Sequence, residues 1–133
     1  MLYHPFYVED TDISYQAWKR GWKCLLAPAS RVVHKHRSTS KTKFGNVFVD
    51  NTIRKNQYLF IWKNVTDAAM TFEHVVNLPR IHLRAMVFDE PMFEVRACFR
   101  ALRQLPEALR KRLANVPRYV LGDREVLARS QKS

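Results

Sequence analysis

Residues 7–37 have the sequence YVEDTDISYQAWKRGWKCLLAPASRVVHKHR, and this stretch decides the fold that we predict. The spacing of its apolar residues predicts a short amphipathic helix over residues 9–20, and Gly21 is a natural stop for that helix. The apolar run 23–27 and the β-branched segment 30–34 each predict a short strand. A helix followed by two strands predicts a compact α/β unit for this part of the chain.

The remainder of the chain carries helical patterns, so we expect two regions. Residues 1–45 form the α/β unit, and residues 46–133 form a basic, mainly α-helical tail. In the tail, a helix that begins near Asn51 is followed by a second helix that ends at Pro79, and Pro91 divides the next stretch. The chain has only three glycines, too few for many tight turns, so we expect it to be helix-rich overall.

The composition narrows the classes of protein and partner that fit this chain. Hydrophobic residues make up 47% of its 133 residues, which excludes an intrinsically disordered chain. The formal net charge of +11 indicates an anionic partner, and nucleic acid, acidic phospholipid and phosphorylated ligands all satisfy that condition. Cys24 and Cys98 form no CxxC pair, so we expect no structural zinc site. The apolar runs are far shorter than the ~18 residues of a membrane-spanning helix.

Three acidic residues, Glu9, Asp10 and Asp12, lie at the start of the first predicted helix. The helix dipole stabilises negative charge at an N-terminus by a few tenths to ~1 kcal/mol, so a purely structural role explains these acids. A carboxylate held near a hydroxyl is also a common general base. Taken alone, the three acids leave both interpretations open.

An ordered set of motifs follows these acids: EDTDIS at 9–14, AW at 17–18, GW at 21–22 and PASRVVH at 28–34. This order resembles the carboxyl-terminal half of family 2 glycosyltransferases, which have the GT-A fold. The resemblance implies an incomplete GT-A-type α/β unit over residues 1–45, on the acceptor side of a catalytic domain. It also implies transfer of a sugar, with inversion, from a nucleotide-diphospho-sugar to a hydroxyl acceptor.

The resemblance also implies a role for each candidate site residue. Asp10, the second acid of the pair, would be the general base, and Glu9 beside it would help to orient the acceptor or the sugar. Asp12 would support the site by capping the helix or bonding the neighbouring loop. His34 would join the shell of a divalent cation, Mn²⁺ or Mg²⁺, in the complete enzyme. Arg37 would face the diphosphate, since its planar guanidinium binds phosphate oxygens in pairs.

The chain departs from this family pattern in one respect. The family's amino-terminal half, with its nucleotide-binding strands and DxD-type acids, has no counterpart before Glu9. We therefore expect a fragment that is inactive without that half and that does not hold the cation alone. The partners implied are the donor, a glycan or lipid-linked acceptor and the missing half. The implied location is the cytoplasm, peripheral on the inner face of the membrane.

Two other functions stay open on the sequence. A nucleic-acid-binding protein would explain the charge, but no helix-turn-helix, zinc or RNP signature is present, so we do not favour it. A membrane-surface module without enzymatic activity would explain the apolar residues of 83–102 among clustered arginines. The same pattern is also typical of helices that pack in a bundle with their charges in solvent.

Overall fold

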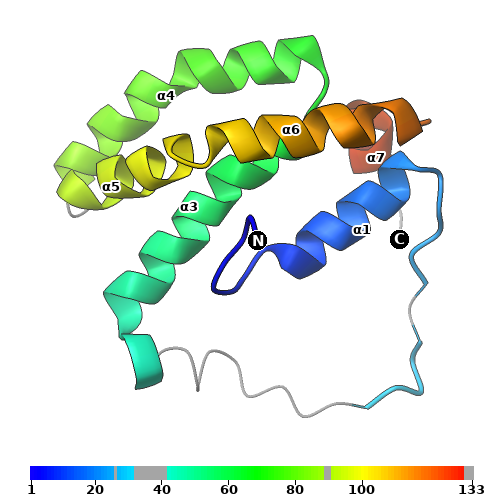
Figure 1. Ribbon diagram of the computed structural model, residues 1–133, viewed down its shortest axis with the longest axis horizontal. Coiled ribbons are helices and arrows are strands. Elements are labelled where there is room, and N and C mark those ends of the chain that lie inside the picture. The colour runs from blue at the N-terminus through cyan, green and yellow to red at the C-terminus, as the bar shows by residue number, and fades with distance from the viewer. Residues whose placement is uncertain (26, 32–41, 89–90, 131–133) are drawn as a thin grey trace.

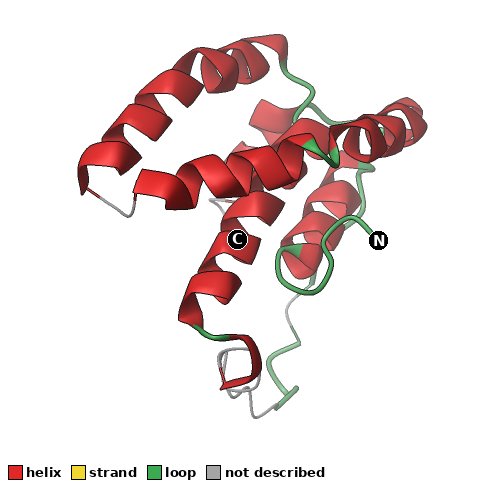
Figure 2. Ribbon diagram, turned by 60° about the vertical axis from the view of Figure 1, so that its left-hand side comes forward, coloured by secondary structure: helices red, strands yellow, loops and turns green. Residues whose placement is uncertain are grey.

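The protein is described by a computed structural model that covers residues 1–25, 27–31, 42–88 and 91–130. Over these ranges the chain forms helices and irregular segments and contains no strand (Figure 2). The prediction of an α/β, GT-A-type unit over residues 1–45 is therefore wrong. Residues 23–25 and 30–31 are irregular and exposed, and the rest of the second predicted strand lies outside the described residues. An apolar run of five residues forms a strand only where a neighbouring strand pairs with it, and the described residues supply none.

The helices follow one another with short connections. They are α1 (Glu9–Lys19), α3 (Asn46–Asn64), α4 (Ala68–Phe88), α5 (Pro91–Leu102), α6 (Leu105–Asn115), the 3₁₀ turn η1 (Val116–Arg118) and α7 (Asp123–Ser130). The helix predicted over residues 9–20 is confirmed as α1. Gly21 ends it in the left-handed region at φ 76°, where glycine is favoured.

Helix α3 is the centre of the arrangement (Figure 1). It packs against α1, α5 and α6, whereas α4 folds back over α5 and α7 lies against α1. The buried core is small and lies between the amino-terminal segment, α3, α5 and α6. Its members are Leu2, Tyr3, Tyr58, Leu59, Ala101 and Ala108. The two alanines let the α5 and α6 backbones approach α3 closely.

Two predicted helix boundaries differ from those of the structure. Helix α3 begins at Asn46, and Asn51, which we expected near its start, is buried within it. The Asn51 side chain donates to the carbonyl of Phe93 at 3.0 Å and accepts from Arg100 at 2.5 Å, so it joins α3 to α5. Helix α4 continues through Pro79 because that residue lies on the exposed side, where water can bond the carbonyl that loses its helical donor. Pro91 begins α5, as expected for a proline at a helix start.

The amino-terminal segment, residues 1–8, is held by polar side chains of α3. Asn56 Nδ2 lies within 3.1 Å of the carbonyl oxygens of Tyr3, Phe6 and Tyr7. Lys55 Nζ donates to the carbonyl of His4 at 3.0 Å. These bonds satisfy backbone groups of a segment without regular structure. They also fix the direction in which the chain enters α1, and therefore the position of the acids at its start.

Lys55 gives the protein a stability that changes with pH. Burial, with the nearby positive charge of Arg100, lowers the pKa of its ammonium group to about 8. Between pH 8 and the ordinary value near 10.4, the unfolded chain binds the proton more tightly than the folded chain, so the free energy of unfolding rises with pH. In the wild type this rise in the free energy of unfolding should be on the order of 3 kcal/mol. We expect it to be absent in Lys55→Met when both proteins are unfolded in urea across this pH range. Lys23→Met, at an exposed site, is the control, and an identical pH profile for wild type and Lys55→Met would contradict this prediction.

Candidate functional site

Asp12 is buried at the centre of one polar network. Tyr3 Oη and Gln16 Nε2 donate to its carboxylate at 2.9 and 2.8 Å. Asn64 Nδ2 donates to it at 2.5 Å, and Lys63 forms an ion pair with its Oδ2. The four donors come from the amino-terminal segment, from α1 and from the carboxyl-terminal end of α3. A carboxylate so fully bonded serves as a structural anchor, because loss of it would leave a buried ammonium group without a counter-ion.

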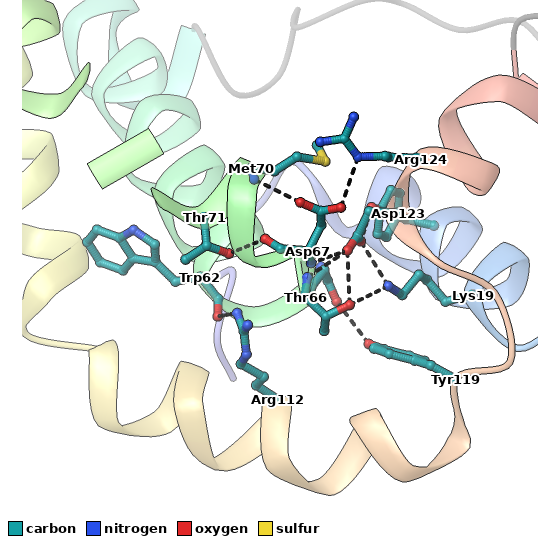
Figure 3. A network of polar contacts seen from close by, with 12 residues as sticks. Lys19, Trp62, Thr66, Asp67, Met70, Thr71, Arg112, Tyr119, Asp123 and Arg124 are labelled. Atoms are coloured by element: carbon teal, nitrogen blue, oxygen red, sulfur yellow. Dashed lines mark hydrogen bonds and ion pairs between the residues drawn. The ribbon is translucent and has the colours of Figure 1, made fainter. Parts of the chain in front are cut away.

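A second network joins α1 to the α3–α4 connection and to α7 (Figure 3). Lys19 Nζ, in a residue that is only 1% exposed, donates to Asp123 Oδ1 at 2.9 Å and to Thr66 Oγ1 at 2.7 Å. Tyr15 Oη donates to the same carboxylate at 2.5 Å. The backbone N–H groups of Thr66 and Asp67 donate to Asp123 Oδ2 at 2.8 and 2.6 Å. Asp123, in α7, therefore accepts bonds from two separate parts of the chain, α1 and the α3–α4 connection.

The electrostatics of Asp123 follow from these contacts. Burial alone would raise the pKa of its carboxyl group. The bonds from Lys19, from Tyr15 and from the backbone of Thr66 and Asp67 outweigh burial and lower the pKa to about 2. For Tyr15, burial together with the bond to this carboxylate raises the pKa of the phenol far above its ordinary value. Asp123 is therefore ionised and Tyr15 protonated at neutral pH.

Asp10 differs from these two acids because its side chain is exposed in the first turn of α1. Its Oδ1 accepts the backbone N–H of the next residue at 2.7 Å, and its Oδ2 has no hydrogen-bond partner among the described residues. Asp10 borders a shallow hollow of about 370 Å³ between α1 and α7. The other lining residues are Thr11, Ser14, Tyr15, Trp18, Val126, Leu127 and Ser130. The hollow thus combines an available carboxylate with two aromatic rings and hydroxyl groups.

Glu9 is exposed as well, but it borders a different hollow. That hollow measures about 310 Å³ and is lined by the amino-terminal segment together with Asp12, Lys63 and Lys111. Successive residues of a helix point about 100° apart, which explains why neighbouring acids face different surfaces. The structure therefore brings Asp10 together with Trp18 and does not place Glu9 in the same hollow.

The remaining predicted site residues, His34 and Arg37, lie outside the described residues. Over the ranges that the structure describes, no three His, Cys, Asp or Glu side chains come together as a metal-binding group. In the same ranges, none of the helices combines the length and the apolar composition needed to cross a bilayer.

The two buried networks were not predicted from the sequence. Lys19, at the carboxyl-terminal end of α1, is buried against Asp123, which lies 104 residues away in the chain. One signal was present: Lys55 and Lys63 recur on the side of α3 that carries Leu59, which is fully buried. A polar stripe aligned with a core residue indicates buried polar partners on other segments.

Comparisons of the chain with protein-family models, with curated proteins and with solved structures find no match. The resemblance to family 2 glycosyltransferases therefore stays a prediction from motifs. What the geometry adds is a distinction between the acids: Asp12 is buried and bonded on all sides, and Asp10 is accessible beside an aromatic hollow.

Proposed function

We propose that this chain supplies the acceptor side of an inverting glycosyl transfer, in which Asp10 is the general base. The observation that carries the proposal is the position of Asp10 at the edge of the hollow between α1 and α7. Within the described part of the chain nothing bonds its Oδ2, and Trp18 and Tyr15 offer ring surfaces of the kind on which sugars stack. The order of motifs from Glu9 onward, which resembles family 2 glycosyltransferases, supports the same assignment.

The chemical step needs little from the protein beyond a positioned carboxylate. The acceptor is a hydroxyl of a glycan or of a lipid-linked sugar, and its oxygen attacks the anomeric carbon of a nucleotide-diphospho-sugar. As the new glycosidic bond forms, the bond to the nucleoside diphosphate breaks on the opposite face, which inverts the configuration. Asp10 Oδ2 takes the hydroxyl proton, and the nucleoside diphosphate leaves with the bonding electron pair.

The donor and a divalent cation belong, in this proposal, to a second protein segment that resembles the amino-terminal half of the family. His34 and Arg37 would face that segment, the first toward the cation and the second toward the diphosphate. A divalent cation, Mn²⁺ or Mg²⁺, would supply charge for the leaving diphosphate when bound. The proposed place of action is the cytoplasm, at the inner face of the membrane, where lipid-linked acceptors are exposed.

The test combines the chain with a donor-binding segment of a family 2 glycosyltransferase. The two are co-expressed, and sugar transfer from a panel of nucleotide sugars is measured with Mn²⁺ or Mg²⁺. We expect transfer that needs both polypeptides and that is strongly slowed by Asp10→Asn. Transfer that proceeds equally without this chain would contradict the proposal.

A further inference from the structure

Helix α4 carries its most apolar surface on the side that faces away from the bundle. We refer to this surface as the outer stripe; its members are Phe72, Val75, Val76, Pro79, Leu83 and Val87. Their spacing of mostly three or four residues places them on one side of the helix. Phe72 is 70% exposed, Leu83 68% and Val87 70%. An ordinary helix of a globular protein would turn this side toward the core.

The side of α4 that does face the bundle carries both polar and apolar side chains, and its Leu78 packs against the core. His74 Nε2 accepts a hydrogen bond from Trp62 Nε1 at 3.1 Å, and the rings of His74 and His82 lie 6.1 and 6.5 Å from that of Tyr58. Ala85 is buried against the bundle. These contacts fix the rotation of α4, so the outward direction of the stripe is a property of the folded chain.

Helix α5, on which α4 packs, has an exposed apolar row of its own. It consists of Met92, Val95, Phe99 and Leu102, again at spacings of three and four residues. A groove of about 690 Å³ lies between this row and the start of α3, where Phe44 and Phe48 are exposed. Each helix of the hairpin therefore carries a row of exposed apolar residues.

Positive charge borders both rows. Arg80 and Arg84 are exposed and each directly follows a member of the outer stripe, which places each about 100° around the helix from it. Arg96 on α5 and Arg103, which directly follows that helix, are exposed. Of the described acids of the two helices, Glu94 is buried, where it pairs with Arg54 of α3, and Glu73, which directly follows Phe72, is exposed. An apolar row beside arginines fits a surface that presents hydrocarbon next to negative charge.

We propose that the hairpin of α4 and α5 lies on the surface of an anionic phospholipid bilayer. The outer stripe enters the boundary between headgroups and acyl chains, and Arg80 and Arg84 contact lipid phosphates. Helix α4, with 21 residues, is about 30 Å long and lies parallel to the surface. A second copy of the chain is a less suitable partner for the outer stripe than a bilayer. Two stripes packed together would bring the arginines of both copies side by side.

The test uses the full chain and two kinds of vesicle, phosphatidylcholine alone and phosphatidylcholine with added phosphatidylglycerol. We expect flotation with the anionic vesicles and much weaker flotation with the neutral ones. The double substitution Phe72→Ser with Leu83→Ser should lower the partition coefficient by about tenfold or more. Arg80→Gln with Arg84→Gln should lower it by roughly tenfold on anionic vesicles and have little effect on neutral ones.

The matched control is Leu113→Ser with Val120→Ser, because these apolar residues are 73% and 70% exposed but lie outside the hairpin. Far-UV circular dichroism confirms that each variant stays helical. No binding of the wild-type chain to anionic vesicles, or an equal loss in the control, would overturn the proposal. The proposal would also be overturned, in favour of a protein partner, if the wild-type chain bound no vesicles and Phe72→Ser with Leu83→Ser lost a dimer or a specific protein complex. Asp10→Asn should bind vesicles normally, which separates this proposal from the catalytic one.

Discussion

Asp10→Asn is expected to lower the rate of sugar transfer in the two-segment enzyme by roughly 10²- to 10⁴-fold, the usual cost of losing a general base. The amide has nearly the shape of the carboxylate but cannot take the acceptor proton. Because Asp10 is exposed and, among the described residues, bonds only to the adjacent Thr11, the substitution leaves the fold in place. The loss should therefore appear in kcat, with little change in donor binding.

Glu125→Gln is the matched control for this prediction. It removes an exposed carboxylate from α7, next to Val126 at the other wall of the hollow, and should leave the rate within about twofold of wild type. An unchanged rate in Asp10→Asn would end the assignment of Asp10 as the base. An equal loss in both variants would show that the charge of the hollow matters and not the position of one carboxylate.

Asp123→Ala should cost the folded chain about 3–5 kcal/mol, the typical cost of leaving one partner of a buried ion pair alone. Lys19 would remain buried without its counter-ion, and the N–H groups of Thr66 and Asp67 would lose their acceptor. Urea unfolding followed by far-UV circular dichroism measures the loss. Glu125→Ala, at an exposed site on the same helix, should change the free energy of unfolding by less than about 0.5 kcal/mol.

The Asp123 carboxylate also makes the free energy of unfolding depend on pH in the acid range. Its pKa of about 2 in the folded chain lies below the ordinary value near 3.9, so the folded state gains stability above that ordinary value. This contribution should be lost as the pH falls from about 4 toward about 2, and the loss should be smaller in Asp123→Asn. Parallel acid-unfolding curves for wild type and Asp123→Asn would contradict the assignment of this carboxylate as a structural ion.

Local signals in the sequence predicted the individual helices better than they predicted the fold class. The acids of α1, its apolar spacing and Gly21 are neighbours in the chain, and they predicted that helix to within about one residue. The two strands were predicted from short apolar runs, which only a pairing partner converts into strands. Because such a partner comes from elsewhere in the fold, the runs alone did not justify an α/β unit.

In the candidate site, too, local features could be predicted from the sequence and contacts between distant segments could not. The sequence indicates directly that Asp10 lies at a helix start. It does not indicate the burial of Lys19, because that burial depends on Asp123 and on how α7 returns to α1. Likewise, the periodicity of α4 predicted an amphipathic helix but not the side that faces the bundle, which the contacts of His74 and His82 with Tyr58 decide.

We propose different roles for two acids that lie two residues apart on α1, a structural one for Asp12 and a chemical one for Asp10. The most direct measurement is the free energy of unfolding of Asp12→Asn and Asp10→Asn, each compared with wild type in urea. We predict a loss on the order of 3 kcal/mol for Asp12→Asn, which leaves Lys63 buried without its counter-ion, and a loss below about 1 kcal/mol for Asp10→Asn. Equal losses in the two variants, or a larger loss for Asp10→Asn, would contradict this proposal.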